Sequence, residues 1–252
     1  MPQPQSQSQS QSRPQTRIDD NDTDGRVLLI TGASSGIGAA TARRAAEAGY
    51  RVALAARSSD KLAKLADDIG RDGAFAIPTD VTEYESQENM VRETLAHFGR
   101  LDAVMANAGV GGKPGGFSGA PIEAWQRIVN VNILGVAYTL RASLEAIRNS
   151  RGHVLLTGSV AGRRIIAGSM YGASKWAVSA IGYALREELR GSGVRVTLLE
   201  PGMVDTPFFD EAKPDALAAD DIARAALYAL SQPRSVDVHE MLVLPTPPVE
   251  GG

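Results

Sequence analysis

The stretch TGASSGIGAATARRAAEAGY, residues 31–50, is the most informative segment of this chain for its fold. It lies between two apolar runs, RVLLI and RVALA, and it contains three glycines near its start, Gly32, Gly36 and Gly38. Glycine loses more conformational entropy on folding than any other residue, so three at one joint indicate a tight turn with a close backbone approach. The pattern predicts a strand, a glycine-rich turn and a helix that leads to a second strand.

Short apolar runs alternate with longer helical patterns along the rest of the chain. The runs predict seven strands, at residues 26–30, 51–55, 74–78, 101–106, 153–157, 194–199 and 240–244. Several are apolar at successive positions, as in strands buried on both faces. Helical patterns at about 58–70, 121–148 and 171–190 fit between them. The alternation predicts one α/β domain, a Rossmann-like, doubly wound, mostly parallel seven-stranded sheet with helices on both faces.

Composition argues against several kinds of protein. The 252 residues carry a net charge of −3 without a strongly basic region, so nucleic acid is not an expected partner. No apolar run approaches the roughly 20 residues that span a bilayer, so no membrane partner is expected. The chain has no cysteine and only three histidines, none at ligand spacing, so no metal site is expected.

The two ends differ from the middle. Residues 1–24 form a Gln/Ser-rich and then acidic segment with almost nothing apolar, which predicts a disordered tail. That segment lacks the apolar region of a secretory signal, so a cytoplasmic location is the default expectation. The domain is expected over 25–245, with 246–252 as a C-terminal tail.

The glycine-rich turn is a candidate phosphate site. In a doubly wound sheet, ligands bind beyond the carboxyl ends of the strands, and the N–H groups at a helix N-terminus bind phosphate there. The glycines allow the close approach, and Ser34 and Ser35 offer hydroxyl groups. The spacing here is G-x-x-x-G-x-G rather than G-x-G-x-x-G, and a glycine-rich turn can be only a turn.

The end of the second strand bears on the choice of cofactor. A carboxylate there favours NAD, whereas an arginine accommodates the 2′-phosphate of NADP. This strand ends in AARS, with Arg57 and no acidic residue, so NADP(H) is the expected cofactor. The alternative is a solvated surface arginine at a strand end.

A reactive pair follows in YGASKWAV. Tyr171 and Lys175 are four residues apart, which places them on one face of a helix. A neighbouring ammonium is expected to lower the phenol pKa towards the range of an acid–base catalyst. Ser159 follows a strand and is expected to hold the substrate oxygen, or else to cap a turn. Asn132 lies within a helical pattern, as a satisfied buried amide or as the support of a water in a proton path.

Taken together, these motifs resemble one family. TGASSGIG, NAG at 107–109, NVNILG, Ser159, YGASK and PGMVDT at 201–206 are similar, in order and spacing, to those of the short-chain dehydrogenase/reductase family. The resemblance covers roughly residues 25–245. It implies that Tyr171 is the general acid/base, that Lys175 binds the nicotinamide ribose, that Ser159 holds the substrate oxygen, and that Asn132 sustains a proton relay.

The resemblance also implies a set of cofactor contacts. Asp80 and Val81 are expected against the adenine, and Thr206 at the nicotinamide carboxamide. The full expected set is Gly32, Ser34, Ser35, Gly36, Ile37, Gly38, Arg57, Asp80, Val81, Asn107, Ala108, Gly109, Tyr171, Lys175, Pro201, Gly202, Val204 and Thr206.

The function implied is NADPH-dependent reduction of a small aldehyde, ketone or keto acid, or oxidation of the matching alcohol. The end of the chain, LSQPRSVDVHEMLVLPT, is similar to that of reductases acting on small hydroxy acids, serine-like alcohols and small aldehydes. Members of the family are usually homodimers or homotetramers. Two alternatives are a dinucleotide-binding regulatory protein without turnover and a reductase of C=C or C=N bonds.

Several residues near the expected substrate space have no assigned role. Lys113 lies in a glycine-rich loop and is read more readily as solvated than as a carboxylate contact. Arg163 and Arg164 fit either an anion contact or a surface pair. Phe208 and Phe209 fit an apolar wall of the substrate space, although packing of the segment on the body is slightly favoured.

Overall fold

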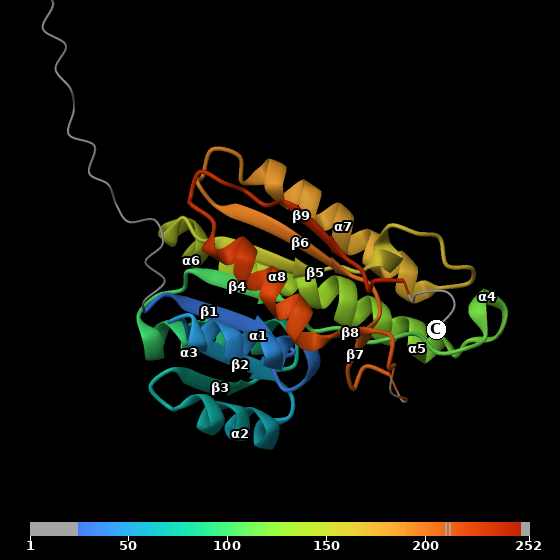
Figure 1. Ribbon diagram of the computed structural model, residues 1–252, viewed down its shortest axis with the longest axis horizontal. Coiled ribbons are helices and arrows are strands. Elements are labelled where there is room, and N and C mark those ends of the chain that lie inside the picture. Colours follow the sequence, from blue (N-terminus) through green and yellow to red (C-terminus); the bar gives the residue numbers. More distant parts are fainter. Residues whose placement is uncertain (1–24, 210, 212, 248–252) are drawn as a thin grey trace, which may run out of the picture.

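A computed structural model describes residues 25–209, 211 and 213–247 of the chain. At its centre lies a seven-stranded sheet in the order β3-β2-β1-β4-β5-β6-β9, with every neighbouring pair parallel (Figure 1). The strands are β1 (Val27–Thr31), β2 (Arg51–Ala56), β3 (Ala74–Pro78), β4 (Ala103–Ala106), β5 (His153–Thr157), β6 (Arg195–Pro201) and β9 (Glu240–Val243). The predicted fold class is confirmed, and all seven predicted strands are present.

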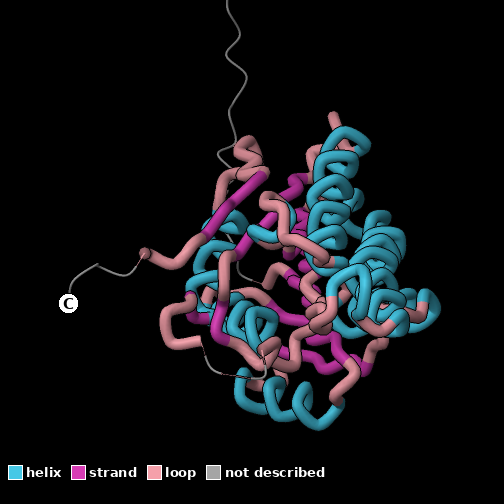
Figure 2. Tube along the Cα trace, turned by 90° about the vertical axis from the view of Figure 1, so that its right-hand side faces the viewer, coloured by secondary structure: helices cyan, strands magenta, loops and turns pink. Residues whose placement is uncertain are grey.

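Helices cover both faces of the sheet (Figure 2). One apolar core lies between the sheet and α1 (Gly36–Glu47), α2 (Ser59–Ile69) and α8 (Ala219–Ser231). The other lies between the sheet and α3 (Tyr84–Phe98), α6 (Gly135–Ser150) and α7 (Met170–Glu188). The side chains of β1 and β5 are buried on both faces of the sheet, so these strands contribute to both cores, as their continuous apolar runs predict. No described helix is both long and apolar enough to cross a membrane.

The helix expected at 121–148 is more complicated than its periodicity indicates. It consists of α5 (Ile122–Ile128), a π-helical stretch η1 (Val129–Leu134) and then α6, with right-handed helical backbone angles at both joints. A π-helical insertion adds a residue to one turn, and such insertions are frequent at functional sites. Here the π-helical stretch contains the fully buried Asn132.

Four short elements border the carboxyl ends of the strands. They are α4 (Gly116–Gly119), the 3₁₀ turn η2 (Val160–Gly162), and the strands β7 (Val204–Asp205) and β8 (Leu217–Ala218), which pair in parallel. The sequence does not predict α4, β7 or β8, because two to four residues are too few to show a periodicity. Each lies in a segment between a strand of the sheet and the next long helix (Figure 1), and β7 contributes Val204 to the pocket described below.

The glycines of the β1–α1 joint answer two separate requirements. Gly32 and Gly36 have positive φ angles of 68° and 54°, which side chains other than glycine rarely adopt. Gly38 has an ordinary φ, but a Cβ added there would lie 2.5 Å from the carbonyl oxygen of Gly32 and 2.7 Å from Nδ2 of Asn107. The first two glycines turn the chain, and the third lets α1 approach the strand that precedes it.

Candidate functional site

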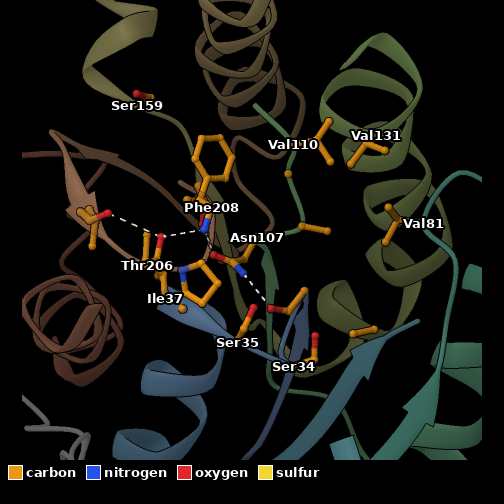
Figure 3. Close-up of a pocket in the computed structure, with 18 of the residues that line it drawn as sticks. Ser34, Ser35, Ile37, Val81, Asn107, Val110, Val131, Ser159, Thr206 and Phe208 are labelled. Atoms are coloured by element: carbon orange, nitrogen blue, oxygen red, sulfur yellow. Dashed lines mark hydrogen bonds between the residues drawn. The ribbon is translucent and has the colours of Figure 1, made fainter. Parts of the chain in front are cut away.

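A cavity of about 340 Å³ lies at the carboxyl ends of the strands, where a doubly wound sheet binds its ligands. Every residue predicted for the site lines this cavity except Gly38 and Asn132. Figure 3 shows Thr206 and Phe208 on one side of the pocket and Val81, Val110 and Val131 on the other. The lining also includes residues that the sequence does not single out: Ala56, Ser58, Thr79, Val110, Val131, Thr157, Gly158 and Pro207.

The N-terminus of α1 faces the pocket. Ser35 is the N-cap residue, but its side chain makes no capping hydrogen bond, and both Ser34 and Ser35 line the cavity (Figure 3). Among the described residues, no side chain caps the first N–H groups of α1. An uncapped helix N-terminus with glycines that allow close approach suits the phosphates of a dinucleotide. The residues present therefore fit a nicotinamide dinucleotide at this place.

Charged groups at the ends of β2 and β3 border the same end of the pocket. Arg57 follows β2, lines the cavity and is exposed. Asp80 also lines it, and its carboxylate accepts hydrogen bonds from the amide and the hydroxyl of Thr82 at 3.0 and 2.8 Å. Burial raises the pKa of Asp80, but these bonds and the charge of Arg57 outweigh burial and hold the pKa below its usual value. Arg57, which can bind an anion, and the anionic Asp80 thus lie near each other at this end of the pocket.

Asn107 fastens the end of β4 to the glycine-rich turn. Its Nδ2 donates to the carbonyl of Thr31 at 3.0 Å, and its Oδ1 accepts from the hydroxyl of Thr157 at 3.2 Å. The hydroxyl of Thr31 accepts from the amides of Asn107 and Ala108 at 3.0 and 3.2 Å. Because its polar atoms are used inside the protein, the Asn107 side chain shapes this wall of the pocket.

Asn132 is a satisfied buried amide. Its Oδ1 accepts from the amide of Val110 at 2.8 Å, and its Nδ2 donates to the carbonyl of Val110 and to the hydroxyl of Ser174, both at 3.0 Å. These bonds tie the loop after β4 to η1 and α7. Of the two interpretations left open by the sequence, the structural one accounts for all three contacts of the side chain.

Tyr171 and Ser159 meet in the pocket. Burial raises the pKa of Tyr171, and a hydrogen bond with the Ser159 side chain lowers it only in part. Ser159 also begins η2, where its hydroxyl accepts from the amide of Ala161 at 3.1 Å. The expectation that a neighbouring ammonium depresses the phenol pKa is therefore wrong for this structure, because burial outweighs the groups that favour the phenolate.

Lys175 is buried beside Tyr171. Its Nζ lies 5.8 Å from the centre of the Tyr171 ring and donates to the carbonyl of Thr157 at 2.7 Å. Burial lowers the pKa of Lys175 to about 8. The predicted spacing on one helix face is confirmed, but the ammonium is directed at a backbone carbonyl, so its effect on the phenol is small.

Phe208 forms part of the pocket wall. Its ring centre lies 5.7 Å from that of Tyr171, and a Cβ added at Gly111 would meet the ring at 3.2 Å. Phe208 and Phe209 both line the cavity, so the slight preference for mere packing is wrong. Thr206 holds the segment in place, since its hydroxyl accepts from the amide of Phe208 at 3.4 Å.

The three cationic residues without an assigned role do not line the pocket. Lys113 and Arg164 are exposed. Arg163 donates to the buried carboxylate of Glu200 at 2.6 Å and pairs with Glu240. The sequence gives no signal for this pairing, because both partners come from strands far along the chain.

Comparisons with known proteins agree with this geometry. The chain matches the family described as short chain dehydrogenase over residues 26–217. It is 37% identical to an uncharacterised oxidoreductase of Staphylococcus aureus, with 87% of this chain and 97% of that protein covered.

Two solved structures are similar across nearly the whole fold. An alcohol dehydrogenase from Thermococcus sibiricus, complexed with 5-hydroxy-NADP, has a TM-score of 0.82 and 34% identity, covering 90% of this chain and 99% of that one. A 3-ketoacyl-(acyl-carrier-protein) reductase from Brucella melitensis, complexed with NADH, has a TM-score of 0.81 and 30% identity, covering 87% and 97%. Relatives with this fold therefore bind either nicotinamide dinucleotide.

Proposed function

The chain belongs to the short-chain dehydrogenase family, and from that premise we propose an NADPH-dependent oxidoreductase that acts on a small carbonyl compound or the matching alcohol. The observation that carries the proposal is the meeting of Ser159, Tyr171 and Lys175 in a pocket that also holds the uncapped N-terminus of α1. A dinucleotide and a small carbonyl substrate are the ligands that such a combination suits.

The chemistry assigned to the chain's own residues is proton transfer at the substrate oxygen. Bound NADPH supplies a hydride. Tyr171 is protonated at neutral pH because burial raises its pKa, so it can give its proton to the carbonyl oxygen as that oxygen gains negative charge. The Ser159 hydroxyl donates a hydrogen bond to the same oxygen. Lys175 is assigned to the cofactor ribose and Asn132 to the support of a proton relay, and the side chain of Asn132 also holds the loop after β4 to the helix that carries Lys175.

A raised phenol pKa bears on direction. A protonated Tyr171 is the acid that reduction requires, whereas alcohol oxidation requires the phenolate as a base. Reduction consumes the Tyr171 proton and oxidation requires its absence, so we expect the rate of reduction to fall and the rate of oxidation to rise as the pH increases.

The preference for NADPH rests on Arg57, which stands where an acidic residue would favour NAD. The relative from Thermococcus sibiricus carries an NADP derivative, while the one from Brucella melitensis carries NADH, so the family alone does not decide the matter. The homodimer or homotetramer and the cytoplasmic location stay predictions. A binding protein without turnover is a weaker candidate, as is a reductase of C=C or C=N bonds. The hydroxyls of Tyr171 and Ser159 are suited to donate a proton and a hydrogen bond to a carbonyl oxygen.

The decisive experiment replaces Tyr171 by Phe. We expect kcat for NADPH-dependent reduction of a panel of small aldehydes, ketones and keto acids to fall by about 10²–10⁴-fold, because the proton donor is lost. NADPH affinity, followed by quenching of the Trp125 and Trp176 fluorescence, should change little. Tyr228→Phe, on the exposed face of α8, is the control. Turnover that survives in Tyr171→Phe would refute the assigned role.

The cofactor preference has its own test. Arg57→Ala should weaken NADPH binding by roughly tenfold to a hundredfold, since a charge-assisted hydrogen bond contributes about 1.5–3 kcal/mol, and should leave NADH binding nearly unchanged. Arg71→Ala, at an exposed position beyond the pocket, is the control. Equal losses for both dinucleotides would contradict the role given to Arg57.

A further inference from the structure

A second hollow lies at the opposite end of the sheet from the pocket. It measures about 20 Å³ and sits where β1, β4, β5 and β6 begin. Four arginines border it, Arg26, Arg151, Arg195 and Arg234, together with Asp102 and His153. A hollow of this size admits one oxygen atom, so a larger group would insert one oxygen and lie among the guanidinium groups at the rim.

Arg195 carries a buried charge without a direct ion-pair partner among the described residues. It is 8% exposed, and its guanidinium donates to the carbonyls of Ala229, Leu230 and Val236 at 2.8, 3.2 and 3.4 Å. Across the part of the chain that the structure describes, no carboxylate lies within ion-pair distance of it. A buried charge without a counter-charge is costly, so an anion at this place would stabilise the folded protein.

The neighbouring cations add to the imbalance. Burial is the main cause that lowers the pKa of Arg195; Tyr50 and Asp237 raise it in part, and the charges of Arg26 and Arg234 lower it further. Two carboxylates are near, but each already has a partner of its own. Asp102 is held by two hydrogen bonds from Arg100, at 2.8 and 2.7 Å, and Asp237 by one from Arg186, at 2.9 Å. Tyr50, also on the lining, is neutral below its raised pKa.

Arg151 stands in a backbone conformation that favours glycine. It ends α6 with φ of 49°, and it is the one residue other than glycine with positive φ among those that the structure describes. Glycine or asparagine is the usual choice at such a helix end, so arginine there costs about 1 kcal/mol. An outlier of this kind points to a use for its side chain.

His153 leaves a buried acceptor beside the arginines. Its Nε2 lies 2.7 Å from the hydroxyl of Thr197, which itself donates to the carbonyl of Val238 at 2.6 Å. The hydroxyl proton is therefore used, so Nε2 must be the protonated nitrogen and Nδ1 the bare one. Nδ1 is buried without a partner. The side chain of His153 lines the hollow, and the oxygens of hydrogen phosphate can accept hydrogen bonds from the guanidinium groups beside it.

From these observations we propose that the arginine hollow at the amino ends of β1, β4, β5 and β6 is a second ligand site, for a phosphate group. Arg151 and Arg234 bind the phosphate oxygens at the rim, and Arg195 provides the buried charge beneath them. This site is independent of the proposed oxidoreductase activity. Its ligand is a phosphate-bearing small molecule that stabilises the fold from the end remote from the pocket.

Inorganic phosphate is the probe, titrated by calorimetry into the full chain at constant ionic strength. We expect saturable binding and a rise in Tm with phosphate concentration, because a ligand that binds only the folded state stabilises it. Arg151→Gly and Arg234→Gln should each weaken binding by about tenfold or more. Glycine suits the backbone at position 151, so that variant should fold at least as well as the parent.

Two control variants separate this site from others. Arg92→Gln, an exposed arginine of α3, should bind phosphate normally. Arg57→Ala should also bind normally, which distinguishes the hollow from the pocket at α1. Unchanged phosphate affinity in both Arg151→Gly and Arg234→Gln would overturn the proposal, as would the absence of saturable binding to the parent.

The acidic run that precedes Arg26 in the sequence offers a different source of negative charge. Replacing Asp19, Asp20, Asp22 and Asp24 by Asn in the full chain tests it. Phosphate binding that is the same with and without these carboxylates supports the proposal. Binding that appears only after their removal would assign the arginines to the chain's own carboxylates and overturn it.

Discussion

Tyr171 and Lys175 show how one physical cause moves two pKa values in opposite directions. Burial disfavours whichever form is charged, so it raises the pKa of the phenol and lowers that of the ammonium. The two effects leave a proton on Tyr171 at neutral pH and bring Lys175 within reach of titration near pH 8.

The buried lysine makes folding stability depend on pH. Its pKa is about 8 in the folded protein, against 10.5 as its usual value. Between these values the unfolded chain binds more protons than the folded one, so stability from this group rises with pH across the window. We expect the unfolding free energy of the parent, relative to Lys175→Met, to rise by about 3 kcal/mol from pH 8 to 10.5, at about 1.4 kcal/mol per pKa unit.

Urea denaturation of both proteins at several pH values measures this difference. Subtracting the Lys175→Met curve removes the contribution of every other titrating group. Two curves that stay parallel through the window would show that Lys175 keeps an ordinary pKa in the folded state.

For single residues, the sequence predicts their positions better than it predicts the effect of their surroundings on their pKa values. The spacing of Tyr171 and Lys175 places them correctly, because helix geometry is local. The direction of the phenol pKa depends on burial by segments distant in sequence, so the spacing alone predicts it wrongly. The sequence likewise does not predict the ion pair of Arg163 with Glu200, because Glu200 lies in β6, distant along the chain.

Among the elements, the joint between β1 and α1 is the one that the sequence describes best. The glycines predict this joint well, because other residues adopt the positive φ angles of Gly32 and Gly36 only with strain. The π-helical η1 is the opposite case. An apolar stripe in the sequence predicts a helix, but a single inserted residue scarcely alters that stripe. Within the insertion, Asn132 makes hydrogen bonds with Val110 and Ser174, which are distant in sequence.

The third glycine of the joint provides a test at this scale. In Gly38→Ala the new Cβ would meet the backbone oxygen of Gly32, which cannot turn aside as a side chain can. We expect a loss of about 1–3 kcal/mol in unfolding free energy, together with weaker NADPH binding, because α1 must move away from the turn. Chemical denaturation and fluorescence titration measure the two effects.

Gly119→Ala is the matched control, because nothing lies within 4 Å of a Cβ built there. Its stability should stay within about 0.5 kcal/mol of the parent. If Gly38→Ala were as stable as this control and bound NADPH equally well, the close approach of α1 to the turn would be unimportant.

For the whole molecule, the pocket is the meeting place of segments from residue 32 to residue 209. A ligand bound there contacts segments that join six strands of the sheet, so its binding free energy adds to the stability of the complete fold. At a concentration of 100 Kd this addition is about 2.7 kcal/mol. For a chain of this size, NADPH should raise Tm by roughly 5–10 °C.

Differential scanning calorimetry with NADPH, and with NADH at the same concentration, measures this effect. A smaller shift with NADH is expected if Arg57 selects NADPH. Tyr171→Phe should retain most of the shift with NADPH, because its hydroxyl is only one of many expected cofactor contacts and its main proposed role is catalytic. An unchanged Tm in saturating NADPH would contradict the proposal that the pocket binds it.

The strand order has a consequence for synthesis on the ribosome. β1 emerges first and lies in the middle of the sheet, β2 and then β3 are added on one side, and β4, β5, β6 and β9 are added in turn on the other. Each newly made strand therefore finds its hydrogen-bonding neighbour already outside the exit tunnel. The nascent chain can extend its sheet outward without leaving an internal gap for a later segment to enter, which limits the time that strand edges stand open to other nascent chains.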